Sequence, residues 1–261
     1  MKGRRVPFAV SATAVLTYAF LHLPLVVLIA FSFNRSRFGV QWGGFTLDWF
    51  TRLASRPDIL RALRLSLVVG VASTLLATVI GTVAALALSR HRRRVRRVAE
   101  ALLYLPIVTP EIVAGVSLLV LFSWLGITLG ITTIVIAHTA FSIPFVTVVV
   151  LARLEGTDRA LEEAAMSLGA DELSTFRRIT LPLLLPGIRA GALLAFTLSF
   201  DDFVTTFFVS GVGSTTLPLA VYSMVRKSVE PTINALSALL VIVTTVAVYF
   251  ADRLARGSTR A

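Results

Sequence analysis

The chain has 261 residues, of which 56% are hydrophobic and 15% are charged, and its formal net charge is +11 at pH 7. A soluble domain averages roughly 45–50% apolar and about 25% charged residues. This composition excludes an ordinary soluble domain and indicates an all-α integral membrane protein. The absence of cysteine from the sequence excludes disulfides and thiolate metal sites.

No aspartate, glutamate, lysine or arginine occurs in residues 65–89 or in residues 112–152. One helical crossing needs about 20 apolar residues, so the second stretch holds more than one. Pro106 and Pro110 should kink or break the third span. We expect a single transmembrane domain, 1–261, with six spans at about 8–33, 65–88, 99–125, 131–152, 188–210 and 233–251.

Lysine and arginine are unequally divided between the two sides that this topology defines. With both termini in the cytoplasm, the inner segments carry 17 of the 25 and the outer segments carry 8. The positive-inside rule therefore favours a multi-pass protein with both termini cytoplasmic. The basic run Arg90–Arg97 then faces anionic membrane lipid, which explains it better than nucleic-acid binding does.

Three acidic residues fall inside predicted spans: Glu111, Asp201 and Asp202. An ionisable group at membrane depth is costly and by default suggests a functional site. Glu111 is 14 residues beyond Arg97 and Asp201 is 14 beyond Gly187, so each lies about 21 Å up its span if the segments are helical. Both carboxylates would then share one layer, where transporters tend to bind substrate.

Alternative interpretations of these acids stay open. Glu111 can be a first-turn acid favoured by a helix dipole, and Asp201 or Asp202 can pair with a basic group of a partner subunit. Adjacent carboxylates point about 100° apart, and we favour Asp201 as the one that faces a pathway. Unpaired, these groups would take up protons, whereas a cationic substrate would keep them ionised.

The aromatic residues Trp49 and Tyr222 are expected near the outer surface. Their first interpretation is an interfacial belt. A cation–π contact with an amine is the alternative. Of the three histidines, His22 and His138 fall in predicted spans, where we expect each to bond a neighbouring helix, and the set shows no metal-ligand spacing.

A polar segment, residues 154–186, separates the fourth and fifth spans. We expect two short helices there. Thr157 or Asp158 would cap the first, and Gly169 would end it in the left-handed conformation. Asp171 would cap the second, and Pro182 would stop it. A solvated loop helix is the alternative interpretation of this segment.

Seven positions of this segment form a recognisable pattern: Glu163, Ala164, Ala165, Gly169, Ile179, Leu181 and Pro182. The pattern resembles the signature loop of ABC importer permeases, without departure at any of the seven positions. The resemblance implies the type I ABC importer permease fold. It also implies that residues 154–186 carry the cytoplasmic coupling helix, which docks into a groove of the ATP-hydrolysing subunit.

Other stretches resemble the second permease subunit of the spermidine/putrescine importers in this family. They include Leu198-Ser199 followed by Asp201-Asp202, and the match extends over nearly the whole chain. Glu111 stands where an aspartate is expected, a change that keeps the charge. The resemblance implies polyamine transport, with Ser199 as a further residue of the substrate pathway beside the acidic ones.

The resemblance also implies an assembly in the bacterial inner membrane. Its partners would be a homologous permease, two ATP-binding subunits and an extracytoplasmic substrate-binding protein. The sequence contains no Gly-x-x-x-x-Gly-Lys-Ser/Thr loop. We therefore expect ATP and Mg²⁺ to be bound by the partners, and this chain to be no enzyme and to hold no cofactor or metal. A permease for iron, thiamine or phosphonate, or an ATP-independent transporter or channel, remains an alternative.

Overall fold

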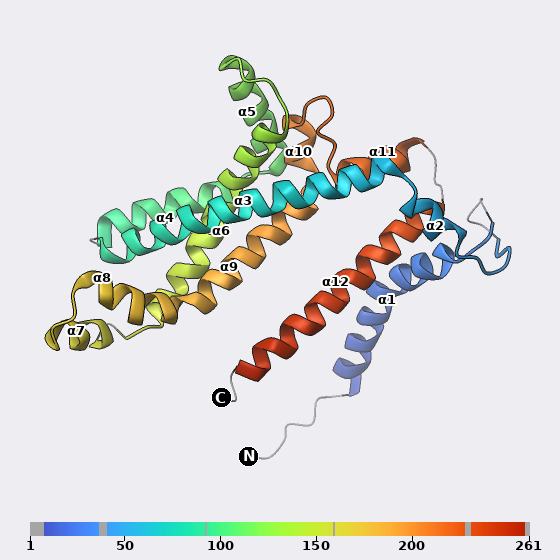
Figure 1. Ribbon diagram of the computed structural model, residues 1–261. Coiled ribbons are helices and arrows are strands. Elements are labelled where there is room, and N and C mark those ends of the chain that lie inside the picture. The colour runs from blue at the N-terminus through green and yellow to red at the C-terminus, as the bar shows by residue number, and fades with distance from the viewer. Residues whose placement is uncertain (1–7, 37–40, 92, 159, 228–230, 259–261) are drawn as a thin grey trace. The chain divides into compact units, whose positions relative to one another are not determined.

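The computed structural model describes residues 8–36, 41–91, 93–158, 160–227 and 231–258, and the regular structure in these ranges is helical (Figure 1). An isolated bridge between Asn34 and Phe45 is the one β-type pairing within them. The chain divides into two compact units, Met1–Leu60 with Val221–Ala261 and Arg61–Ala220.

The first unit contains α1 (Phe8–Ser32), α2 (Asp48–Ala54) and α12 (Pro231–Ser258), and α12 packs against both α1 and α2. The loop between α1 and α2 is held by the buried Asn34. Its side-chain amide donates to the backbone carbonyl of Gln41 at 2.8 Å. The indole N–H of Trp49 in α2 donates to the carbonyl of Asn34 at 2.7 Å, so polar contacts fix the loop to α2.

The second unit is built around α6 (Ile131–Glu155), whose most apolar stretch is more than half buried. This helix packs against α4 (Arg93–Val108), α9 (Leu181–Asp201) and α10 (Val204–Val209), and α5 (Glu111–Trp124) packs against α10. The other elements of this unit are α3 (Pro57–Arg90), α7 (Ala160–Ser167), α8 (Glu172–Thr175), a π-helical turn (Phe176–Thr180) and the start of α11 (Leu217–Lys227).

Two hydrophobic clusters form the core of the second unit. The first joins α3 and α6 to α9, and the second joins them to α5 and α10. The first consists of Ala77, Ala85, Val146, Val150, Leu151 and Ala195. The second consists of Val69, Phe122, Ile134, Ala137 and Val209. Alanine is frequent in these clusters because small side chains allow close packing between helices that are surrounded by lipid.

Four described helices are long and apolar enough to cross a membrane: Val10–Ser32, Pro57–Arg90, Ile131–Glu155 and Glu172–Asp201. The predicted break in the third span is present, because Arg94–Val108 and Glu111–Trp124 meet at a 99° bend next to Pro110. If this pair forms one span the number rises to five. The last predicted span coincides with a shorter apolar helix, Pro231–Val246.

Two predicted boundaries were wrong. Pro182 does not stop a helix, since the helical path continues from Glu172 to Asp201. Proline is compatible with the first turn of a helix. Pro182 lies in the first turn of α9, directly after the π-helical turn. The N–H of Leu181 bonds to the carbonyl of Phe176 in that π-helical turn. The helix expected to reach residue 210 ends at Asp201, because Asp202 has extended backbone angles.

A close backbone approach fixes the end of α10 against the start of α6. A Cβ atom added at Gly211 would lie 1.9 Å from the carbonyl oxygen of Leu129, which leaves no room for a side chain. Nearby, the Thr133 hydroxyl donates to the carbonyl of Val209 at 2.7 Å and joins the same two elements.

We predict that Gly211→Ala destabilises the second unit, because a backbone atom must move to admit the new methyl group. The apparent melting temperature of the purified protein should fall by roughly 4 °C or more. Gly130→Ala is the matched control, since a Cβ there meets open space. Equal melting temperatures for both variants would contradict the predicted packing.

Candidate functional site

A cavity of about 770 Å³ opens within the second unit. Its walls are formed by α4, α5, α6, α9 and the start of α10. Aromatic and aliphatic side chains predominate, among them Phe141, Phe145 and Phe203. Among the described residues that line the cavity, the charged side chains are those of Glu111, Asp201 and Asp202.

The three acidic residues predicted from the sequence therefore line one cavity. Glu111 lies in the first turn of α5, directly after the bend at Pro110. Asp201 is the last residue of α9, and its side chain is exposed. The estimate of equal depth assumed a continuous helix before Glu111, which the 99° bend rules out. What brings the carboxylates together is the bend in one span and the end of the helix in another.

Asp202 differs from Asp201 in its surroundings, since its side chain is only 7% exposed. Its carboxylate accepts hydrogen bonds from the backbone N–H groups of Thr205 at 3.3 Å and Thr206 at 2.7 Å. These are amides of the first turn of α10, which have no partner inside that helix. Asp202 thus caps α10 after the break, as a side-chain acceptor caps any helix N-terminus.

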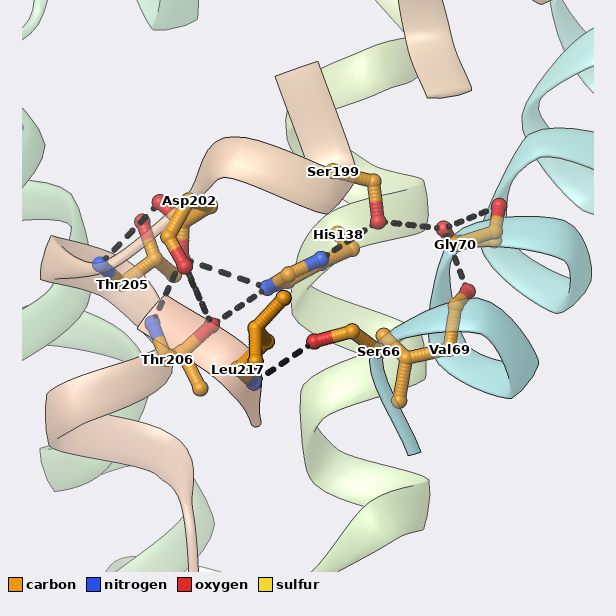
Figure 2. Close-up of polar contacts among 10 residues, drawn as sticks. Ser66, Val69, Gly70, His138, Ser199, Asp202, Thr205, Thr206 and Leu217 are labelled. Carbon is orange, nitrogen blue, oxygen red and sulfur yellow. Dashed lines mark hydrogen bonds and ion pairs between the residues drawn. The ribbon is translucent and has the colours of Figure 1, made fainter. Parts of the chain in front are cut away.

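A buried polar network extends from Asp202 to α3 (Figure 2). His138 of α6 is at its centre and is 1% exposed. Its Nε2 lies 2.9 Å from Thr206 Oγ1 and 3.3 Å from Asp202 Oδ2. Its Nδ1 lies 2.7 Å from Ser199 Oγ of α9, and Ser199 Oγ lies 2.9 Å from Ser73 Oγ of α3.

Sequence reasoning found only part of this network. It expected His138 to bond another helix, and this agrees with the structure. Ser199, predicted for the substrate pathway, lies in the network and is not among the described residues that line the cavity. It did not find Ser73 or Thr206, because serine and threonine are frequent in apolar helices and commonly bond their own helix. Their spacing from His138, 65 and 68 residues respectively, carries no local signal.

The polar segment after α6 contains the predicted caps. Asp158 Oδ1 accepts from the N–H of Ala160 at 2.9 Å, whereas the Thr157 hydroxyl donates back to the Arg153 carbonyl, so Asp158 is the capping residue. Gly169 lies just after α7, which ends at Ser167, and its φ of +90° is the positive value that was predicted for it. Asp171 Oδ1 accepts from Ser174 N–H at 3.3 Å and caps α8.

The seven pattern residues occupy three parts of this segment. Glu163, Ala164 and Ala165 belong to α7, where Glu163 and Ala164 are exposed. Ile179 lies in the π-helical turn, and the remaining three are Gly169 in the turn after α7 and Leu181 and Pro182 in the first turn of α9. The hydroxyl of Thr180 donates to Glu162 Oε1 at 2.6 Å and ties α7 to the π-helical turn.

A family model described as "Binding-protein-dependent transport system inner membrane component" matches residues 77–260. The chain belongs to this family. It is 43% identical over 243 residues to the spermidine/putrescine transport system permease protein PotC of Escherichia coli K12, covering 93% of this chain and 92% of the relative. It is also 41% identical over 232 residues to the putrescine transport system permease protein PotI of the same organism, covering 86% of this chain and 83% of that one.

A solved structure shares the fold at low sequence identity. It is that of a bacterial alginate ABC transporter in complex with an alginate pentasaccharide-bound periplasmic protein. The TM-score is 0.73 at 19% identity, covering 97% of this chain and 94% of that one. The residues that the family model matches include the cavity lining and the polar segment at 154–186. Both features therefore lie in the part of the chain that is similar to inner membrane components of transport systems.

The two aromatic residues predicted for the pathway belong to the first unit, whereas residues of the second unit line the cavity. Trp49 is 8% exposed, and the guanidinium carbon of Arg52 lies 5.0 Å from the centre of its ring. Its indole N–H is already bonded to the carbonyl of Asn34, so Trp49 has a packing role between α2 and the loop that precedes it. Contacts of Trp49 or Tyr222 with a substrate amine stay predictions.

We predict that Asp171→Ala loosens α8, whereas Asp171→Asn preserves it, because asparagine is an equally good N-cap and alanine is not. Hydrogen exchange measured by mass spectrometry on the reconstituted transporter should show faster deuterium uptake at residues 172–175 in the alanine variant alone. Equal uptake in both variants would contradict the capping role.

The same cap should depend on pH. Hydrogen bonding from Ser174 lowers the pKa of the Asp171 carboxyl below its ordinary value of 3.8. The contribution of a carboxylate with a lowered pKa is fully present above the ordinary value and is lost as the pH falls through the lowered one. At neutral pH the cap is therefore intact.

Proposed function

We propose that the chain is the transmembrane permease subunit of an ATP-driven ABC importer for polyamines, and that it forms half of the translocation pathway. One observation carries the substrate class: carboxylates from two separate helices line a largely apolar cavity, and its described lining contains no lysine or arginine. The similarity to polyamine permeases supports the same assignment.

The cavity chemistry complements a polyamine. Such a molecule carries ammonium groups separated by methylene chains. Asp201 and Glu111 supply counter-charges, and a hydrogen bond to a charged group is worth about 1.5–3 kcal/mol. Phe141 and Phe145 supply an apolar surface for the methylenes, and an aromatic face also attracts a cation. An anionic substrate would meet two unfavourable charges.

The topology that we propose places one permease domain over residues 1–261, with six spans and both termini in the cytoplasm. The excess of lysine and arginine on the inner side supports this orientation. The third span would be the bent pair α4 and α5, and the sixth would be α12. The chain would then present residues 154–186 to the cytoplasm.

In this orientation α7 would be the coupling helix. Large apolar side chains are exposed on this helix and next to it. Leu168 is 90% exposed, and Met166 and Leu173 are exposed as well. An apolar group of this size on a short cytoplasmic helix favours a protein partner. Two ATP-binding subunits would bind ATP and Mg²⁺ and drive the cycle, so this chain would supply no catalytic residue or cofactor site of its own.

The complete importer would also contain a homologous permease subunit and an extracytoplasmic substrate-binding protein. Substrate delivery on the outside and ATP hydrolysis on the inside would alternate access to the acidic cavity. The second permease would close the pathway from the opposite side.

We predict that spermidine and putrescine stimulate the ATPase activity of the reconstituted complex, and that an anionic control does not. Asp201→Asn and Glu111→Gln should each raise the half-maximal spermidine concentration about tenfold or more, because each removes a charge-assisted contact. Ser117→Ala, which alters an uncharged lining residue, is the matched control. Unchanged values in both acid variants would exclude the acidic cavity as the polyamine site.

We predict that Leu168→Glu uncouples the ATP-binding subunits, because docking would bury an unpaired carboxylate. Substrate-stimulated ATPase activity should fall about tenfold or more, and less of the ATP-binding subunit should co-purify with the permease. Ser167→Ala is the control, since that hydroxyl bonds only within its own helix in the described contacts, to the Glu163 carbonyl. Full activity and normal co-purification of Leu168→Glu would place the docking surface elsewhere.

A further inference from the structure

The buried network around His138 places an oxygen atom within hydrogen-bonding distance of each nitrogen of the imidazole ring. It crosses four helices, from Ser73 in α3 through Ser199 and His138 to Asp202 and Thr206 (Figure 2). Each serine or threonine hydroxyl has one proton to donate, and a neutral imidazole also has one. The positions of these protons therefore bear on the charge of the ring.

The count starts at α3. Ser73 Oγ donates to the carbonyl of Val69 at 2.8 Å, and this uses its one proton. We assign this proton to the contact with Val69 because the alternative contact within the helix, to the Gly70 carbonyl, is longer at 3.3 Å. Ser73 then accepts in its contact with Ser199 at 2.9 Å. Ser199 therefore donates to Ser73, and its oxygen has no proton left for His138. The contact of 2.7 Å between Ser199 Oγ and His138 Nδ1 requires a proton on Nδ1.

The count at the other side of the ring has the same form. Thr206 Oγ1 donates to Asp202 Oδ2 at 2.7 Å. Its contact with His138 Nε2 at 2.9 Å then needs a proton on Nε2. That N–H also lies 3.3 Å from Asp202 Oδ2. With both nitrogens donating, each contact of the ring with Ser199, Thr206 and Asp202 is a hydrogen bond.

We infer that His138 is a buried imidazolium that neutralises Asp202, so that this carboxylate does not serve as a counter-charge for a substrate. The carboxylate of Asp202 then serves the fold: it caps α10 and pairs with His138. The counter-charges offered to a substrate are those of Asp201 and Glu111. The ion pair is inferred from the contacts alone. Its consequence for substrate binding rests on the proposed cation pathway.

The surroundings of the ring are consistent with this assignment. On the elements packed against it, the groups that face it are the hydroxyls of Ser199 and Thr206, the carboxylate of Asp202, and the ring of Phe141 on its own helix. The other carboxylates of the cavity, on Asp201 and Glu111, also favour a positive charge nearby. Ionised groups inside membrane proteins characteristically pair with one another.

The protonation of His138 can be measured directly by ¹⁵N NMR on the complete complex in lipid nanodiscs with ¹⁵N-labelled histidine. The signals of His138 are those that disappear in His138→Gln. At pH 7 we expect both ring nitrogens to carry a proton in the wild type, and one to lose it in Asp202→Asn. An unprotonated ring nitrogen in the wild type would overturn the inference.

A double-mutant cycle tests the pairing independently. Removing one partner of a buried pair leaves the other uncompensated, so His138→Gln and Asp202→Asn should each lower the apparent melting temperature by roughly 6 °C or more. The double variant should lose less than the sum of the two. Additive losses would overturn the pair.

The third measurement is the half-maximal spermidine concentration for stimulation of ATPase activity. In the double variant the half-maximal spermidine concentration should change by less than about threefold, against about tenfold or more for Asp201→Asn. A change as large as that of Asp201→Asn would show that Asp202 faces the substrate, and would overturn the inference. If polyamines do not stimulate the wild type, the proposed substrate fails, while the NMR and melting data still decide the ion pair.

Discussion

A break in a membrane-spanning helix exposes backbone amides that hydrocarbon cannot hydrogen bond, so the protein itself must satisfy them. Here the break follows Asp201, and the carboxylate of Asp202 accepts from the first amides of α10. A buried carboxylate needs a compensating charge or donors in turn, and His138 with the hydroxyl of Thr206 provides them. The break, its cap and the partner of the cap thus form one unit, and without it Asp201 would not stand at the end of a helix beside the cavity.

The cavity is made by two interruptions of helical structure. On one side α9 ends at Asp201, and on the other the third span bends by 99° before Glu111. In both places an acidic residue stands where a helix stops or begins, next to backbone dipoles that other parts of the chain must balance. Transporters commonly form substrate sites at discontinuous helices, because irregular backbone is tolerated in a membrane only where it is buried or lines a cavity.

Local signals in the sequence were sufficient for much of this architecture. Apolar length located four of the long helices, Pro110 marked the bend, and Gly169 and Asp171 marked the turn and the cap between α7 and α8. Signals that depend on tertiary contacts were not readable. The end of α9 at Asp201 is set by the hydrogen bonds of Asp202 and not by a helix-breaking residue. Pro182 was misjudged because the π-helical turn before it, which allows the helix to continue, has no sequence signature.

The continuity of that helix connects the two regions for which we propose coupling and substrate binding. The path from Glu172 to Asp201 is helical throughout and includes the π-helical turn. One end meets α7 through the contact of Thr180 with Glu162, and the other end places Asp201 at the cavity. Coupling between distant sites requires an element whose position both sites can bias. A continuous helix with contacts at both regions meets this requirement for the coupling that we propose, because a movement of α7 would then be transmitted to Asp201 at the cavity.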